Sequence, residues 1–283
     1  MKLLRATRIN LLQWRNDPKY LTVFLYMVLY MYKCVYGICG YAQDLGLPIH
    51  PWVFPFLMRG WYTICPLMLG YVILIADAPF RNRQQQFILL RTGKRIWLGG
   101  QILYLFLLSM VFTGLFWLLS IVFILPEIKL STDWGSFLTT IAINDVPGEY
   151  GSAIDAQYSV MKGISPINAT LWVAVVLIFV CFLLGLIMLL CNLWAKKGVG
   201  TVMVSAIVIM PMLTQFFQYT PYVYRYLTWI SPMNWVDRSI LGYTGQNLPS
   251  YTYAMVMPIV LSLILVIVAM TTIHRCNLET DKE

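Results

Sequence analysis

The chain has 283 residues, of which 59% are hydrophobic and only 11% are charged. Soluble globular proteins carry about a quarter of their residues as charged side chains. Together with a mean hydropathy of +0.71, this composition excludes that class and predicts an integral membrane protein. The net charge of +8 does not indicate nucleic-acid binding, because the basic residues gather in the segments that flank the apolar runs.

Residues 1–20 form a segment in which basic and apolar side chains interleave before Pro18. This pattern predicts a helix that lies in the membrane interface with its basic groups toward lipid phosphates. An ordinary basic flank to the first span is the alternative. The apolar run that follows is too long for a secretory signal and has no small-residue cleavage site, so we expect a retained first helix.

Six stretches are apolar over about 20 residues, the length that a helix needs to cross a hydrocarbon core of about 30 Å. They are Leu21–Tyr41, Phe56–Ala76, Leu98–Leu125, Leu171–Leu193, Val199–Tyr219 and Tyr253–Ile273. Their unbroken apolar character predicts an all-α integral membrane protein with six transmembrane helices. We expect one transmembrane domain over residues 1–283.

The loops between these spans differ in charge. Residues 1–20, 77–97 and 196–197 hold most of the lysines and arginines, whereas the long loop at residues 126–168 is mostly acidic. By the positive-inside rule, both termini lie in the cytoplasm of a multi-pass protein of the plasma (inner) membrane. We expect the outer loop 126–168 to be small and ordered, and its contact with substrate or a partner stays an open alternative.

The residue patterns of catalysis are missing from the sequence. A phosphate-cradling GxxxxGK[ST] loop, an HExxH pair and a GxSxG elbow are all absent, and the cysteines have no metal-ligand spacing. We therefore expect no enzyme activity, cofactor or metal in this chain, and the cysteines to fill apolar space.

The loop 77–97 begins with Asp77 and Pro79, which are typical of a helix start. A short helix with an intermittent apolar side and a basic side follows, suited to docking into a groove on a soluble partner. A merely solvated basic loop is the alternative. The residues expected to make the contact are Phe80, Arg81, Arg83, Phe87, Leu90, Arg91, Lys94 and Arg95.

Two charged residues, Lys33 and Arg59, fall inside the predicted spans. Ionisable groups at membrane depth are functional candidates because burying them unpaired is costly. Both lie toward the outer leaflet, so they either extend to the headgroups or contact substrate or lipid.

Between the last two spans stands TPYVYRYLTWISPMNWVDRSILG, residues Thr220–Gly242. Its aromatic residues fit an interfacial belt, but a belt does not explain the proline-centred break at Ser231–Asn234 followed by Asp237 and Arg238. Non-helical backbone at membrane depth must be buried in protein or line a cavity.

This segment resembles the one after the fifth helix in type-two permeases of ATP-binding-cassette (ABC) exporters. A second segment, LLRTGKRIWLGGQIL at Leu89–Leu103, is similar to the cytoplasmic coupling helix of that family, although the acidic residue usual near Arg83 is missing. The resemblance implies an interfacial helix over 1–20, a coupling loop over 77–97 and a re-entrant region over 220–252. The outer gate would then comprise Tyr226, Trp229, Pro232, Asn234, Trp235, Asp237 and Arg238.

The resemblance further implies ATP-driven export of an antimicrobial peptide, drug or lipid. The permease would pair with a second copy or a sister permease among membrane lipids. Separate ABC ATP-binding subunits would hold ATP and magnesium. Two other classes stay open: an ion-coupled secondary carrier, which favours ionisable groups near the bilayer midplane, and a non-transporting scaffold or immunity protein.

Overall fold

A computed structural model describes residues 7, 10, 11, 14, 17–80, 93–144, 146, 150–151, 154, 156–195, 198–242 and 247–275. Over these residues the chain is helical, and the only strand-like pairing described is an isolated bridge between Ile49 and Ile128. The predicted all-α class is confirmed. Most of the predicted interfacial helix lies outside the described residues.

Five helices are long and apolar enough to cross a membrane, which indicates a multi-pass membrane protein. They are α2 (Pro18–Leu45), α6 (Lys94–Val122), α9 (Pro166–Trp194), α10 (Val199–Phe216) and α12 (Tyr251–Thr272). Each overlaps a stretch predicted from the sequence.

The second predicted span, Phe56–Ala76, is divided. A short helix, α3 (Phe54–Leu57), ends before Arg59, and α4 (Trp61–Ile75) begins after Gly60, whose φ of 81° is readily adopted only by glycine. The 15 residues of α4 extend roughly 22 Å, less than a hydrocarbon core. A sixth crossing therefore stays a prediction.

Capping residues in the sequence set where long helices begin. Asp17 accepts a hydrogen bond from the Lys19 backbone N–H at 3.0 Å, directly before Pro18 at the first helical position of α2. Ser250 starts α12 in the same way, accepting from the Tyr253 N–H at 3.1 Å. These caps satisfy backbone donors that the helix leaves unpaired.

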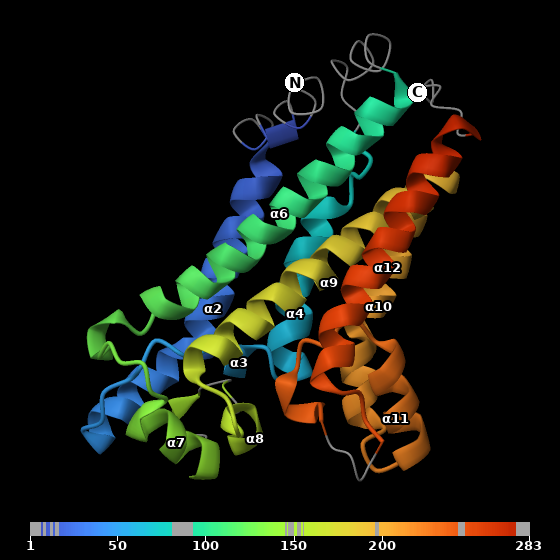
Figure 1. Cartoon of the computed structure of the whole chain (residues 1–283). Coiled ribbons are helices and arrows are strands. Elements are labelled where there is room, and N and C mark those ends of the chain that lie inside the picture. The colour runs from blue at the N-terminus through green and yellow to red at the C-terminus, as the bar shows by residue number, and fades with distance from the viewer. Residues whose placement is uncertain are drawn as a thin grey trace.

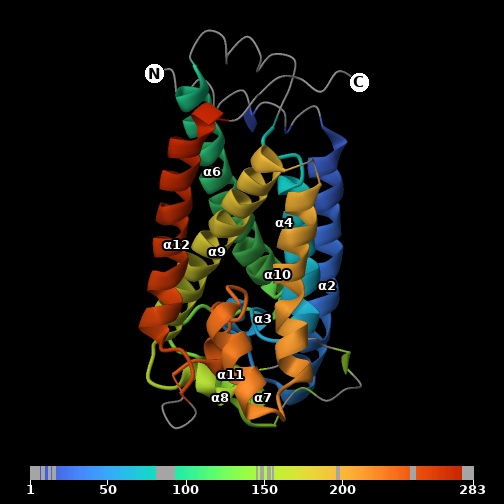
Figure 2. The ribbon, with the colours of Figure 1, turned by 90° about the vertical axis from the view of Figure 1, so that its right-hand side faces the viewer.

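The helices alternate in direction, so the bundle has two distinct ends (Figures 1 and 2). We call the end where α2 begins and α12 finishes the proximal end, and the opposite one the distal end. At the distal end lie η2 (Leu125–Glu127), α7 (Gly135–Asn144), α8 (Tyr158–Met161), α11 (Pro221–Ile230) and η4 (Arg238–Ile240), while η6 (Ile273–Arg275) ends the described chain proximally.

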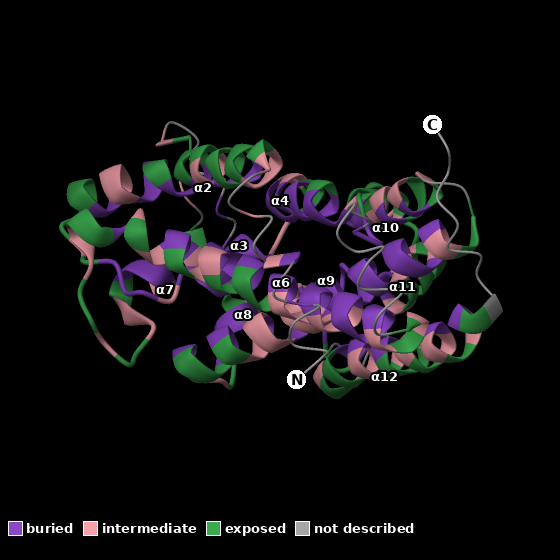
Figure 3. Ribbon diagram, turned by 90° about the horizontal axis from the view of Figure 1, so that it is seen from above, coloured by how far each residue is buried: buried purple, intermediate pink, exposed green. Residues whose placement is uncertain are grey.

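Helix α9 is the centre of the bundle. It packs against α4, α6, α10 and α12, and the view along the bundle shows it between them (Figure 3). In its most apolar stretch, 72% of residues are buried, against 22% in α12 and 28% in α10. The latter two helices therefore keep large apolar faces exposed, as lipid-facing helices do.

The predicted outer loop, residues 126–168, forms a small helical layer across the distal end. Phe137, Leu138 and Ile141 on one face of α7 are all fully buried. Trp134 ties the layer to the segment before α9, because its Nε1 donates to the Ile164 carbonyl at 3.1 Å. The described residues of this loop are thus packed against one another, while order over the whole of 126–168 stays a prediction.

Candidate functional site

The chain reverses direction after α10, and α11 packs back against it at the distal end (Figures 1 and 2). The Thr220 N–H donates to the Phe217 carbonyl at 2.9 Å in the turn, and Pro221 occupies the first position of α11. Ile230 ends the helix before Pro232, because a residue preceding proline disfavours continued helix. Helix α10, α11 and the following turn form a unit that we call the distal hairpin, residues 199–237.

Asn234 locks the distal hairpin together. It is 3% exposed, and its Nδ2 donates to Thr214 Oγ1 in α10 at 2.7 Å and to the Leu227 carbonyl in α11 at 3.3 Å. The Asn234 N–H also lies 3.1 Å from the Ser231 carbonyl. One buried amide therefore joins three parts of the hairpin, and buried amides are stable only when their donors are used in this way.

Aromatic residues attach the distal hairpin to α12. The Trp229 carbonyl accepts hydrogen bonds from Trp235 Nε1 at 3.2 Å and from the Tyr253 hydroxyl at 3.3 Å. The rings of Trp229 and Tyr253 are 4.5 Å apart in an edge-on arrangement, a favourable geometry for aromatic pairs. Trp235 is 2% exposed, whereas Trp229 and Tyr253 are half-buried, so Trp235 belongs to the packed interior rather than to an interfacial belt.

Asp237 and Arg238, adjacent in sequence, point to different surroundings. The Asp237 carboxylate accepts from the Ser239 N–H at 2.8 Å and the Ser239 hydroxyl at 2.6 Å, and so caps η4. Desolvation by burial raises the pKa of Asp237, opposed by the Ser239 hydrogen bonds, the Arg59 charge and the Gly60 N–H. The carboxylate therefore joins η4 to the break between α3 and α4.

Arg238 fills a separate aromatic pocket. Its guanidinium carbon lies 4.1 Å from the Tyr251 ring centroid and 5.6 Å from that of Trp172. Its Nε donates to the Val160 carbonyl at 3.2 Å. Because desolvation lowers the pKa of this residue, burial carries a cost that the ring faces and the carbonyl offset. Arg238 thus fastens η4 to α8, α9 and α12.

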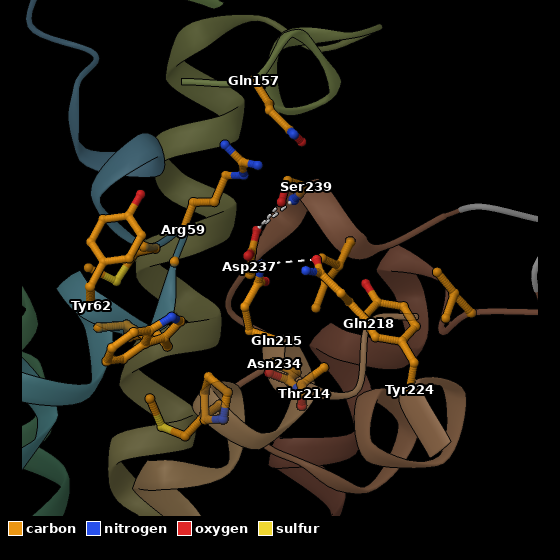
Figure 4. Close-up of a pocket in the computed structure, with 18 residues that line it drawn as sticks. Arg59, Tyr62, Gln157, Thr214, Gln215, Gln218, Tyr224, Asn234, Asp237 and Ser239 are labelled. Atoms are coloured by element: carbon orange, nitrogen blue, oxygen red, sulfur yellow. Dashed lines mark hydrogen bonds between the residues drawn. The ribbon is translucent and has the colours of Figure 1, made fainter. Parts of the chain in front are cut away.

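A cavity of about 450 Å³ lies between the distal hairpin and the break before α4 (Figure 4). This volume is within the range typical of ligand pockets. The polar side chains that line it are Arg59, Tyr62, Gln157, Thr214, Gln215, Gln218, Tyr224, Asn234, Asp237 and Ser239. In Figure 4, Arg59 extends toward Gln157 and Ser239 beside Asp237, while Gln215 and Gln218 lie toward the side of Tyr224.

The structure brings together only part of the predicted outer gate. Asn234 and Asp237 line the cavity, whereas Trp229, Pro232, Trp235 and Arg238 do not. Trp229 and Trp235 contact Tyr253, Arg238 contacts Tyr251 and Trp172, and Pro232 is buried in the turn. Tyr226 is 65% exposed on α11 and points away from this packing.

The two charged residues predicted within spans, Arg59 and Lys33, lie in different surroundings. Arg59 lies at the break between α3 and α4 and lines the cavity. Lys33 is exposed on α2 and is not part of the lining. Gln157, Gln215 and Gln218 are cavity residues that the sequence analysis missed. Polar side chains three residues apart at the end of an apolar span were the available signal for the latter two.

Of the predicted coupling residues, Phe80, Lys94 and Arg95 lie at the proximal end, and Arg81, Arg83, Phe87, Leu90 and Arg91 are outside the described residues. Phe80 is 4% exposed and stacks edge-on against Tyr104 at 4.8 Å, so its ring belongs to the bundle interior and not to a docking surface. Lys94 is partly exposed in the first turn of α6. Arg95 is exposed, and its Nε donates to His274 Nε2 at 2.7 Å.

Asn192 anchors the start of the loop 77–97. Its Nδ2 donates to the Ala78 carbonyl at 2.7 Å, and its Oδ1 accepts from the Gly200 N–H at 2.9 Å. Gln101 holds the same segment, since its amide bonds both the N–H and the carbonyl of Phe80, at 3.3 and 3.5 Å. The beginning of the loop is therefore fixed to the first turn of α10. Asp77, expected to cap a helix, instead accepts from Lys19 Nζ at 2.8 Å.

Among the described residues, no three His, Cys, Asp or Glu side chains are grouped as metal ligands would be. In comparisons with known proteins, no protein-family model, no curated protein and no solved structure matches the chain. Its function must therefore be argued from the cavity, the hairpin and the proximal anchor.

Proposed function

We propose that the chain is the membrane permease subunit of an ATP-driven ABC exporter. It would act as a dimer, with itself or a sister permease, and each half would engage a separate ATP-binding subunit that holds ATP and magnesium. In this proposal the proximal end faces the cytoplasm of the plasma (inner) membrane, and the cavity opens toward the outer leaflet. The resemblance of Leu89–Leu103 and Thr220–Gly242 to the family's coupling and exit segments supports it.

The observation that favours transport over a scaffold is that α10 extends from the start of the loop 77–97 to the cavity. Its first turn is bonded through Asn192 to the segment at Ala76–Ala78 that begins the loop 77–97. At the other end of α10, Thr214 and Gln215 line the cavity. Gln218 also lines it, just after the helix ends. Helix α10 is continuous between these two ends, with Pro211 interrupting its hydrogen bonds only in the part that lines the cavity. A displacement of the loop would therefore move the cavity wall.

We infer the following cycle. ATP-driven closure of the partner subunits pushes on the loop 77–97, and Asn192 passes the movement to α10. The distal hairpin then shifts as a unit, because Asn234 bonds α10 and α11 together. The wall of the cavity moves relative to Arg59, which belongs to the separate break between α3 and α4. Such movement opens or closes the cavity without a large change in any single helix.

The first experiment tests for the motor. The tagged chain is purified from its native membrane in mild detergent, and the associated proteins are identified and quantified by mass spectrometry. We expect an ATP-binding subunit in stoichiometric amount, lost in Arg91→Glu and Phe87→Ala. Arg225→Glu, an exposed charge reversal on α11 at the distal end, is the matched control and should retain the subunit. Absence of an ATPase in detergent and after crosslinking in intact membranes would refute the proposal.

The second experiment tests transmission through Asn192. A cysteine introduced as Gln218→Cys reports the cavity through its labelling rate with a membrane-impermeant thiol reagent. We expect ATP with vanadate to change this rate at least severalfold in the assembled complex. Asn192→Ala should keep the ATPase subunit but lose the change, and Asn168→Ala, an exposed asparagine on the same helix, should behave as the parent. A rate that follows an ion gradient instead of ATP would favour a secondary carrier.

A further inference from the structure

We propose that the distal cavity binds a zwitterionic phosphoethanolamine group, supplied by a phospholipid, with its phosphate at Arg59 and its ammonium at Asp237. This inference rests on the proposed function in one respect, that the lipid headgroup would be the cargo or its leading part. The binding itself requires only the chain described here.

The charge of the lining selects the ligand class. Among the described residues that line the cavity, two are charged, Arg59 and Asp237, one of each sign, and they lie beside each other (Figure 4). A ligand with a net negative charge would meet the carboxylate as well as the guanidinium, and like charges at close range disfavour binding. A group that carries one charge of each sign finds a complementary partner for both.

The remaining polar groups suit a ligand that both donates and accepts hydrogen bonds. Gln215 Nε2 donates to Gln218 Oε1 at 3.0 Å, and each amide carries further donor or acceptor capacity. Gln157 reaches the same space from the helical layer of residues 126–168 (Figure 4). An ammonium needs several acceptors and a phosphate several donors, and amide side chains provide both.

The position of the cavity points to a lipid rather than to a soluble molecule. It lies where α10 ends and α4 begins, at the level of the bundle where apolar helix gives way to polar loops. Tyr219 and Tyr222 nearby in sequence are 89% and 78% exposed, as aromatic side chains at a membrane surface are. Met58 and Ile64 add apolar lining that suits the glyceride end of a headgroup.

The test measures lipid selectivity of the purified full-length chain in nanodiscs of phosphatidylcholine, whose trimethylammonium group has no N–H to donate to the Asp237 carboxylate. Phosphatidylethanolamine or phosphatidylglycerol is added in equal amount, and lipid retained on the chain is quantified by native mass spectrometry. We expect the ethanolamine lipid to be preferred by about tenfold, the value of one charged hydrogen bond at the lower limit. Equal retention of the two lipids by the parent chain would overturn the proposal.

Two variants change the charge balance in opposite directions. Asp237→Asn keeps a capping side chain for η4 but leaves the cavity positive, so selectivity should move about tenfold toward phosphatidylglycerol. Arg59→Gln should weaken retention of both lipids. The controls Arg225→Gln and Asp133→Asn alter exposed residues outside the lining and should match the parent. Unchanged selectivity in Asp237→Asn, or unchanged retention of both lipids in Arg59→Gln, would refute the assignment, so either variant that folds is a sufficient test.

Competition identifies the source of the headgroup. Soluble glycerophosphoethanolamine, a phosphodiester that keeps one charge of each sign, should displace the retained lipid only at millimolar concentration, because the lipid is concentrated in the bilayer. Displacement by dialanine, a zwitterion without phosphate, at equal or lower concentration would overturn the lipid assignment in favour of a peptide end. Since none of these measurements uses the ATPase, their failure would leave the permease proposal standing, and failure to recover an ATPase would leave the lipid site standing.

Discussion

Replacement of Arg238 by methionine tests whether η4 is held by the aromatic pocket. The guanidinium is 4.1 Å from the Tyr251 ring centroid, 5.6 Å from that of Trp172, and bonded to the Val160 carbonyl at 3.2 Å. The residue is only 7% exposed. Arg238→Met keeps a side chain of similar length but removes the charge, the planar group and the donor.

The expected loss follows from these contacts. A desolvated cation–π contact contributes about 2 kcal/mol, and a hydrogen bond from a charged donor about 1.5–3 kcal/mol. The variant no longer buries a charge, which returns part of the several kcal/mol that desolvation of an ion costs. We therefore expect the free energy of unfolding to fall by roughly 2–4 kcal/mol, with Val160 left as an unsatisfied buried acceptor.

Thermal unfolding in mild detergent, followed by tryptophan fluorescence at one fixed scan rate, measures the effect. For a chain of this size we expect the Tm to fall by roughly 5–15 °C. Arg238→Lys keeps the charge but not the planar stacking, so its Tm should lie between that of the parent chain and that of Arg238→Met. A methionine variant that melts within about 2 °C of the parent would show that the aromatic pocket contributes little, and the reasoning would fail.

Further substitutions test the other anchors. In Gly200→Ala, the new Cβ would lie 2.7 Å from Asn192 Oδ1 and from a backbone carbonyl, so we expect a loss of about 1–3 kcal/mol and weaker transmission in the Gln218→Cys labelling assay. Tyr104→Phe removes a hydroxyl that is bonded to Trp14 Nε1 at 2.7 Å, and urea unfolding should report a loss of about 1–3 kcal/mol. Because burial raises the pKa of Asp237, protonation of this carboxyl is more favourable in the folded chain than in the unfolded chain. The Tm should therefore be highest at acidic pH and fall as the pH rises through the raised pKa, a slope that Asp237→Asn should flatten.

The long apolar helices were accessible from the sequence because their length and hydropathy are local properties. α9 and α12 differ from the predicted spans mainly at their ends, by a few residues. The break before α4 was not predicted, since apolar composition continues across it and only Arg59–Gly60 interrupts the run. Hydropathy averaged over a window does not register a single glycine with positive φ.

The candidate site was predicted only in part, and the reason is distance in sequence. Asp237 and Asn234 belong to a segment marked by prolines and aromatic residues, so local pattern found them. Arg59, Gln157 and Gln215 reach the cavity from three other regions of the chain, and no local pattern reports that they converge. The separate settings of Asp237 and Arg238 likewise depend on tertiary packing.

The burial of α9 bears on how the bundle is assembled in the membrane. This helix has the highest mean hydropathy of the five long helices, 3.3, yet it is the most enclosed by protein. A helix of that character enters the bilayer readily without contacts from neighbouring helices. The less apolar α2 and α10, at 1.5 and 1.8, gain more from a surface on which to settle. During biosynthesis α9 would thus insert by its own hydropathy and provide the surface on which the less apolar helices pack. Its apolar character would serve insertion into the membrane more than packing in the folded bundle.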